Sequence, residues 1–147
     1  MKKDIHNNFI KNGSLCIKEL KVIKFNGDKE KIDEFLNGQI TSDHKQLTNN
    51  AFQLSSICNH KGQVIADFIV NKSNEEYRLV INDTLKTTLI NELNPFIKLH
   101  RLEIEETNNI VIGNISTKGD LEYPFCSNKY IEVSISVESH DFKYKNS

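Results

Sequence analysis

Three strand-like segments follow one another at residues 52–59, 63–71 and 76–81, and only short turns separate them. The first turn is His60-Lys61-Gly62, and the second lies at residues 72–74. Parallel neighbours need a crossover of a dozen or more residues, whereas antiparallel neighbours need only a tight turn. The three segments are therefore predicted to pair as hairpins, and the fold is predicted to rest on a mainly antiparallel sheet.

Two segments have the spacing of amphipathic helices. The first, residues 29–36, carries three apolar side chains at i, i+3 and i+4, follows a capping residue, Asp28, and is predicted to end at Gly38. The second begins at about residue 83 and carries leucines at i, i+4 and i+8. Its end is predicted near Leu93, because Pro95 disfavours helix in the residue before it.

The remaining segments complete an α+β fold with two helices on one face of the sheet. Further strands are predicted at 14–25, where the apolar alternation slips near Leu20 as at a bulge, and at 99–106 and 109–115. We divide the chain into a flexible N-terminus at 1–12, one α+β domain at 13–115, and an irregular extension at 116–147 with one candidate strand at 130–137.

Composition limits the classes of function. A net charge of -1 and a pI near 6.5 argue against a protein that coats nucleic acid. No signal-peptide core or membrane-spanning run occurs, so we expect a cytoplasmic protein without a direct nucleic-acid or membrane partner. The three cysteines, Cys16, Cys58 and Cys126, are too scattered for a disulfide framework and are expected to be free thiols.

Signatures of catalysis and metal binding are absent from the sequence. Cys58 and His60 lie two residues apart on a predicted strand, but a zinc site needs about four ligands and no further pair has suitable spacing. A half-buried thiol beside a turn histidine is the favoured interpretation. We therefore expect no catalytic residue and no metal site, and a binding domain in preference to a self-sufficient enzyme.

Three polar residues, Gln39, Thr41 and Asp43, follow the first predicted helix. One interpretation is structural: Thr41 or Asp43 caps a short turn through residues 44–47, and Gln39 bonds stray carbonyl groups. The other is functional, because ligands are often met by loops on a rigid scaffold. The residue types alone favour the structural interpretation.

Asp67 interrupts an apolar strand and is predicted to share a face with Ile65 and Ile69. A carboxylate in such surroundings needs a partner to offset its desolvation. It either protects a strand edge against aggregation or accepts hydrogen bonds from the N–H groups of a ligand. The residues alone leave both roles open.

Two motifs together resemble a known family. Phe-Leu-x-Gly-Gln-x-Thr-x-Asp at 35–43, followed by Cys-Asn-x-Lys-Gly at 58–62 and a hydrophobic strand, is similar to the N-terminal part of the YgfZ family. These folate-binding proteins are related to the aminomethyltransferase of the glycine cleavage system. The resemblance covers residues 15–115 in element order and 35–70 in motif. It implies an aminomethyltransferase-like domain that binds tetrahydrofolate and supports iron–sulfur enzyme maintenance and tRNA modification.

The resemblance also implies which residues contact folate. Asp67 matches an acidic residue that aminomethyltransferases use to contact the pteridine, and Gln39, Thr41 and Asp43 match a loop that borders the same opening. Leu20 aligns near a family tryptophan that is associated with folate. The implied protein partners are iron–sulfur assembly or tRNA-modifying proteins, and a homo-oligomer is left open.

Three departures from the family pattern define the alternatives. Ala66 replaces the first acid of an Asp-Asp pair, the chain has no tryptophan, and Cys126 lacks the later family signature Lys-Gly-Cys-Tyr-x-Gly-Gln-Glu. One alternative is therefore a truncated, ligand-free interaction module of the same fold. The other is one-carbon transfer of the aminomethyltransferase type, which these departures disfavour.

Overall fold

The computed structural model describes residues 13–117, 126–127 and 131–139. These residues belong to two compact units, Glu19–Thr107 and a unit made of Met1–Lys18 with Asn108–Ser147. The first unit is shorter at both ends than the domain expected at 13–115. The expected flexible segment at 1–12 lies outside the described residues, as does most of the extension at 116–147.

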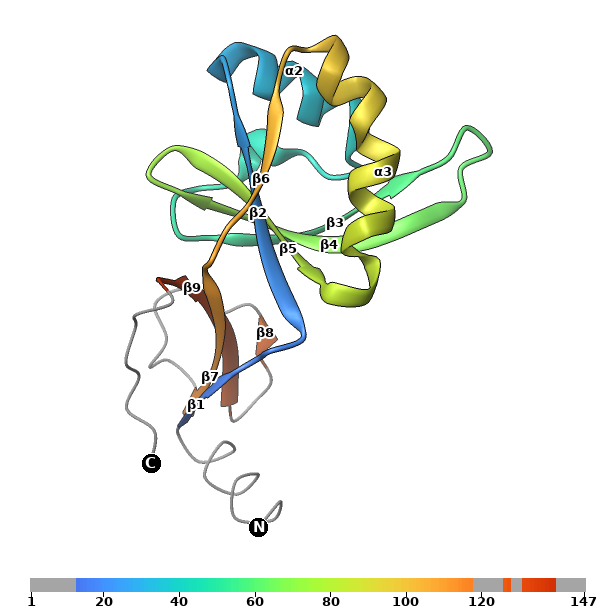
Figure 1. Cartoon of the computed structure of the whole chain (residues 1–147). Helices are drawn as coiled ribbons and strands as arrows, with labels where there is room; N and C mark the ends of the chain where they lie inside the picture. The colour runs from blue at the N-terminus through green and yellow to red at the C-terminus, as the bar shows by residue number, and fades with distance from the viewer. Residues whose placement is uncertain (1–12, 118–125, 128–130, 140–147) are drawn as a thin grey trace. The chain divides into compact units, whose positions relative to one another are not determined.

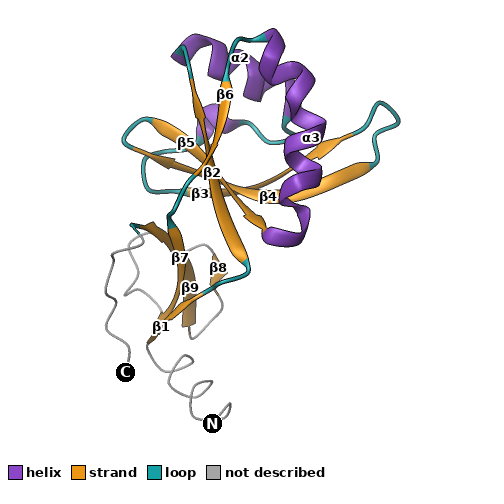
Figure 2. Cartoon of the chain, viewed as in Figure 1, coloured by secondary structure: helices purple, strands orange, loops and turns teal. Residues whose placement is uncertain are grey.

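The larger unit is a five-stranded antiparallel sheet with two helices on one face (Figures 1 and 2). This arrangement confirms the predicted α+β fold class. The strand order is β3-β4-β5-β2-β6. The strands are β2 (Leu20–Asn26), β3 (Phe52–Cys58), β4 (Val64–Ser73), β5 (Glu76–Asn82) and β6 (Glu103–Glu106), and the helices are α2 (Lys29–Gln39), α3 (Asp83–Leu99) and the 3₁₀ turn η1 (His44–Gln46).

The smaller unit contains a second antiparallel sheet, in the order β1-β7-β9-β8. Its strands are β1 (Gly13–Cys16), β7 (Ile110–Thr117), β8 (Cys126–Ser127) and β9 (Ile131–Glu138). The single strand predicted at 14–25 is therefore wrong: β1 and β2 are separate strands of different sheets. The slip in alternation near Leu20 marks this break and not a bulge.

The core of the larger unit lies between the helices and one face of the sheet. Alternate residues of the strands point into it, as Phe68 and Val70 of β4 do, and both are almost completely buried. Helix α2 contributes Phe35, whose ring centroid lies 5.4 Å from that of Phe25 in a tilted pair. On the opposite face the exposure differs from strand to strand: Asp67 of β4 is exposed, whereas Val80 of β5 and Val22 of β2 are only 1% exposed.

Both helices continue beyond their predicted ends. Helix α2 passes through Gly38 with helical backbone, and the amide of Ile40 still donates to the Leu36 carbonyl at 3.1 Å. Helix α3 contains Pro95 and ends at Leu99, which delays the next strand to β6. The physical reason is burial, because Ile97 extends the apolar stripe of α3 and is only 4% exposed.

The turns follow their predicted chemistry. Asp28 caps α2 and accepts hydrogen bonds from the amides of Glu30 at 2.8 Å and Lys31 at 3.4 Å. Between β4 and β5, Asn74 and Glu75 have φ values of 51° and 65°, the positive values of a tight hairpin turn. This turn places Glu75 beside a pocket that is described below.

Candidate functional site

The sheet face that points away from α2 and α3 carries Asp67. In the β3–β4 pair Asp67 lies opposite Ser56, and Ile69 lies opposite Leu54. Ile69 is also opposite Val80 of β5. Directly opposite residues of a ladder project to the same face. We call the surface made by Leu54, Ser56, Asp67 and Ile69 the Asp67 face; the carboxylate on it is exposed to solvent.

Thr41 is held against the same part of the sheet. Its amide donates to the Ser56 carbonyl at 3.0 Å, and its hydroxyl accepts from the Ser56 amide at 3.1 Å. The two hydroxyl oxygens of Thr41 and Ser56 are 3.0 Å apart. Because Ser56 is also the cross-strand neighbour of Asp67, the fold brings two of the residues singled out in the sequence to one serine.

Asp43 serves the structural role that the sequence suggested. Its carboxylate caps η1, accepting from the Lys45 amide at 3.1 Å and from the Gln46 side chain at 3.3 Å. Its carbonyl accepts from the Gln53 side chain at 2.9 Å. Asp43 thereby fixes the loop that carries Thr41 against β3. A direct contact between Asp43 and a ligand stays a prediction.

Gln39 and Leu20 belong to other elements than Asp67. Gln39 is the last residue of α2 and is half-buried. Leu20 is the first residue of β2 and lies opposite Asn82 of β5. The strand order β3-β4-β5-β2 places Leu20 two strands away from Asp67, on the same side of the sheet. The structure therefore links Thr41 to Asp67 through Ser56. Ligand contacts of Gln39, Asp43 and Leu20 stay predictions.

The Asp67 face combines one carboxylate with apolar neighbours. Leu54 is 69% exposed and Ile69 is half-buried. Ile65, which was expected to share this face, packs instead against the core, because the strand register shifts between Ile57 and Cys58. A carboxylate in such surroundings forms charge-assisted hydrogen bonds with N–H donors of a bound molecule, and apolar side chains accept the flat faces of a ring. The arrangement suits a ring system with N–H groups at one edge.

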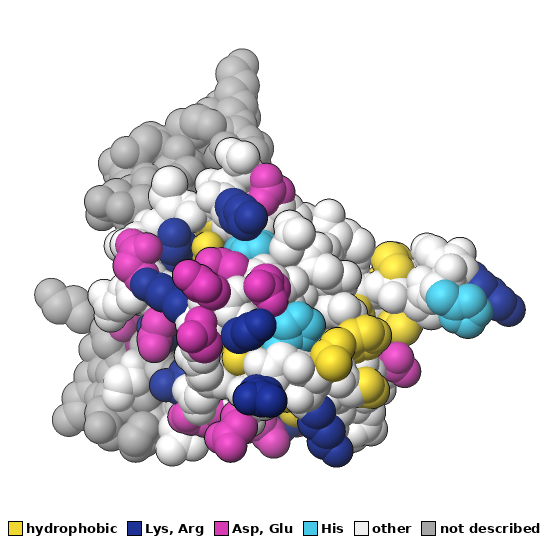
Figure 3. Space-filling view, turned by 90° about the horizontal axis from the view of Figure 1, so that it is seen from above, with side chains coloured by type: hydrophobic (Ala, Val, Ile, Leu, Met, Phe, Trp, Pro, Cys, Tyr) yellow, Lys and Arg dark blue, Asp and Glu magenta, His cyan; other side chains and the backbone are white. Residues whose placement is uncertain are grey.

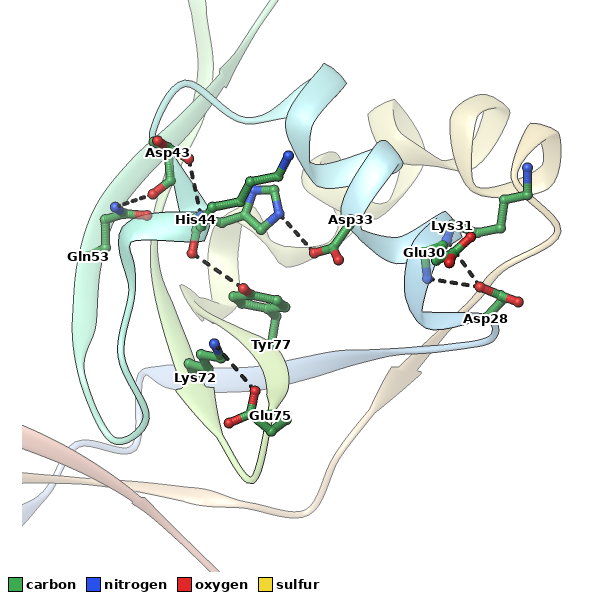
Figure 4. A network of polar contacts seen from close by, with 11 residues as sticks. Asp28, Glu30, Lys31, Asp33, Asp43, His44, Gln53, Lys72, Glu75 and Tyr77 are labelled. Atoms are coloured by element: carbon green, nitrogen blue, oxygen red, sulfur yellow. Dashed lines mark hydrogen bonds and ion pairs between the residues drawn. The ribbon is translucent and has the colours of Figure 1, made fainter.

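A second polar cluster, absent from the sequence-based prediction, lies on the helix side of the sheet (Figure 4). His44 is fully buried, and its Nε2 lies 3.1 Å from Oδ1 of Asp33 on α2. The ring of Tyr77 packs edge-on against the imidazole at 5.1 Å, and the Tyr77 hydroxyl donates to the His44 carbonyl at 3.4 Å. The three residues form one connected unit from α2, η1 and β5.

His44 Nδ1 is buried and makes no hydrogen bond within the described part of the chain. Leaving a buried polar group unpaired costs about 1–3 kcal/mol. Because an ionised carboxylate only accepts hydrogen bonds, Nε2 is the donor in the contact with Asp33. The contact between His44 Nε2 and Asp33 is therefore formed at the cost of an unpaired Nδ1.

A pocket of about 640 Å³ adjoins this cluster. It is lined by Phe25, Asn26, Gly27, Lys29, Ile32, Asp33, Lys72, Asn74, Glu75, Glu76 and Tyr77. Burial raises the pKa of the Tyr77 phenol above its ordinary value. The Lys72 ammonium lies 5.5 Å from the centre of the Tyr77 ring, within the range of a cation–π contact.

The carboxyl group of Glu75, which lines the pocket, has a shifted pKa. Asn49 donates to Glu75 Oε1 at 2.8 Å, and Lys72 Nζ lies 3.6 Å from Oε2. The Asn49 hydrogen bond and then the Lys72 charge lower the pKa of Glu75. A pKa that is lower in the folded than in the unfolded protein means that the charged carboxylate of Glu75 stabilises the fold. This stabilisation is fully present above the ordinary pKa of Glu75 and is lost as the pH falls through the lowered value.

Replacing Asn49 by alanine should therefore raise the pKa of Glu75 toward its ordinary value. The measurement is the pH dependence of the Glu75 side-chain carboxyl signal by carbon-13 NMR in both proteins. Glu34 provides the internal control, because Asn49 forms no hydrogen bond with it. An unchanged Glu75 titration in Asn49→Ala would show that Lys72 alone sets this pKa.

Neither a metal-binding cluster nor a membrane-spanning helix occurs in the described ranges. Residues 13–117, 126–127 and 131–139 contain no group of three or more His, Cys, Asp or Glu side chains placed to hold a metal ion. Within those ranges Cys16 and Cys58 are free thiols. No helix in the described part of the chain is long and apolar enough to cross a membrane.

The fold matches that of a solved aminomethyltransferase. The structure of glycine cleavage system aminomethyltransferase T from Bartonella henselae superimposes with a TM-score of 0.64 at 19% sequence identity. The match covers 76% of this chain and 31% of that chain. The chain thus has the fold of one part of this aminomethyltransferase.

Two curated proteins are distantly similar in sequence. An aminomethyltransferase of Staphylococcus carnosus (strain TM300) is 27% identical over 112 residues, which is 75% of this chain and 30% of that protein. The tRNA-modifying protein YgfZ of Vibrio atlanticus (strain LGP32) is 29% identical over 94 residues, which is 64% of this chain and 28% of that protein. No protein-family model matches the chain. The chain spans less than a third of these relatives and is distantly similar to both.

Proposed function

We propose that the chain is a folate-binding protein that holds the pterin ring of tetrahydrofolate against the Asp67 face. The carboxylate of Asp67 accepts hydrogen bonds from N–H groups at the edge of the ring. Leu54 and Ile69 contact the flat faces of the ring, and the Thr41–Ser56 pair borders it. One observation carries the proposal: the exposed carboxylate of Asp67 lies on one sheet face with the apolar side chains of Leu54 and Ile69, beside the serine that anchors Thr41.

Two comparisons support folate as the ligand. The fold is that of an aminomethyltransferase part, and the sequence is distantly similar to an aminomethyltransferase and to a tRNA-modifying protein. We propose that the chain, like the family it resembles, supports iron–sulfur enzyme maintenance and tRNA modification. Its partners are then iron–sulfur assembly or tRNA-modifying proteins, and it acts by holding folate and not by turning over a substrate alone.

Asp67→Ala should weaken binding of 5-formyltetrahydrofolate about tenfold to a hundredfold. The reason is that hydrogen bonds to a charged group contribute about 1.5–3 kcal/mol, and 1.4 kcal/mol corresponds to a factor of ten in affinity. Isothermal titration calorimetry measures the dissociation constant without an intrinsic fluorophore, which suits a chain that has no tryptophan.

Glu92→Ala is the matched control, because Glu92 is an exposed acid of α3 on the helix side of the sheet. Its affinity for folate should equal that of the unmodified protein. The proposal fails if millimolar folate produces no heat of binding, or if Asp67→Ala binds as tightly as the unmodified protein.

A second candidate function rests on the exposed apolar residues of the β3–β4 hairpin. Leu54 and Val64 are 69% and 64% exposed. Figure 3, seen from the side on which the helices lie, shows further hydrophobic side chains near the base of the protruding hairpin, whereas Leu54 projects from the opposite face. Exposed apolar patches mark interaction surfaces. An interaction module without folate would capture its protein partner equally well with and without added folate, and Leu54→Asp would abolish that capture.

A further inference from the structure

The pocket on the helix side of the sheet is separate from the Asp67 face. Tyr77 packs against the core that the helices cover, and Lys72 lies directly opposite it in the β4–β5 pair. Asp67 projects from the other side of β4. A molecule in this pocket therefore contacts α2 and the β4–β5 turn and cannot touch Asp67.

The walls of the pocket suit a small ring. Phe25, Ile32 and Tyr77 provide aromatic and aliphatic surface, and the volume of about 640 Å³ lies within the range of small-molecule sites. Polar side chains, among them Asn26 and Asn74, line the same pocket beside the charged residues. A ring that carries a polar group therefore meets both kinds of surface here.

The charges of the pocket favour a cation over an anion. Three lining residues are acidic, Asp33, Glu75 and Glu76, whereas only Lys29 and Lys72 are basic. Lys72 is already engaged by Glu75 at 3.6 Å and by the Tyr77 ring. The first amides of α2, which attract anions in other proteins, are instead occupied by the carboxylate of Asp28.

The fold fixes the orientation of the Asp33 carboxylate before any ligand binds. Its Oδ1 is fixed at 3.1 Å by the fully buried His44, while its side chain remains 46% exposed at the pocket wall. Within the described ranges, Oδ2 forms no hydrogen bond or ion pair. A carboxylate whose orientation is fixed before binding loses less entropy when it meets a ligand.

We propose that this pocket binds a small organic cation, an amidinium or ammonium group carried on a flat apolar ring. Asp33 is its counter-ion, the ring lies against Tyr77 and Phe25, and His44 is a positioning residue that holds Asp33. The site is independent of folate binding at the Asp67 face, so either proposal can fail without the other.

Benzamidine, benzamide and benzoate are probes of one shape with positive, zero and negative charge. Nitrogen-15 NMR titration of the full chain should show saturable shifts of the Ile32 and Tyr77 amide signals with benzamidine. Benzamide should bind at least about tenfold more weakly, because a hydrogen bond to a charged partner is worth that factor. Equal binding of benzamide, stronger binding of benzoate, or no saturable shift with benzamidine would overturn the proposal.

Asp33→Asn tests the counter-ion, and Glu34→Gln on the neighbouring position of α2 is the control that does not line the pocket. Asp33→Asn should weaken benzamidine about tenfold or more, whereas Glu34→Gln and Asp67→Ala should leave its affinity unchanged. Unchanged affinity in Asp33→Asn contradicts the proposal. If Asp33→Asn does not fold, the preference of the unmodified protein for benzamidine over benzamide decides.

Discussion

Replacing Phe35 by alanine should lower the free energy of unfolding by about 3–5 kcal/mol, the range measured for buried aromatic truncations. Phe35 is 0% exposed and stands at the centre of the larger unit. Its ring lies 5.4 Å from that of Phe25 and 5.9 Å from that of His100, so truncation removes contacts to β2 and to the end of α3 together. Such a loss is a large fraction of the 5–15 kcal/mol that stabilises a typical domain.

Urea unfolding followed by far-ultraviolet circular dichroism measures this change, since the chain lacks tryptophan. Phe96→Ala is the matched control: Phe96 is 39% exposed on α3, and its loss should lower stability by clearly less than the loss of the fully buried Phe35. Similar losses in the two variants would show that Phe35 is not part of the packed core.

Gly27→Ala should destabilise the protein by about 2–4 kcal/mol, through backbone strain and overpacking. Gly27 has a φ of +143°, which side-chain-bearing residues rarely adopt. An added Cβ would lie 2.5 Å from Cδ2 of Leu102, which is itself only 5% exposed in the core. Neither the backbone nor its neighbour can therefore relieve the substitution easily.

Gly38→Ala should instead raise the free energy of unfolding. Gly38 lies within α2 with helical backbone, and no atom lies within 4 Å of an added Cβ. Alanine is favoured over glycine in a helix by about 0.5–1 kcal/mol. Thermal unfolding of the two variants should thus move the midpoint in opposite directions, and a shared direction would contradict the backbone conformations described here.

The antiparallel sheet could be predicted because short turns allow no other pairing of β3, β4 and β5. The helix ends could not be predicted from local signals. Gly38 and Pro95 are strong local stop signals, but burial of Ile97 outweighs the second of them. Local propensity and tertiary burial compete at helix ends, and only burial depends on the rest of the fold.

The Asp67 face was partly predictable. Period-two alternation gives the side of β4 on which Asp67 lies, but only the β3–β4 register shows that Ser56, and with it Thr41, is its neighbour. The pocket beside Asp33 and Tyr77 left no signal in the sequence. Asp33, His44 and Tyr77 lie 11 and 33 residues apart and meet only through the packing of α2, η1 and β5.

The central claim is that folate lies against the Asp67 face, and nitrogen-15 NMR mapping tests it most directly. Addition of 5-formyltetrahydrofolate should shift the amide signals of Leu54, Ser56, Asp67 and Ile69 in a saturable manner, and Asp67→Ala should remove these shifts. The pocket signals of Ile32 and Tyr77 should stay in place. Shifts confined to Ile32 and Tyr77, or no saturable shift at millimolar folate, would contradict the account.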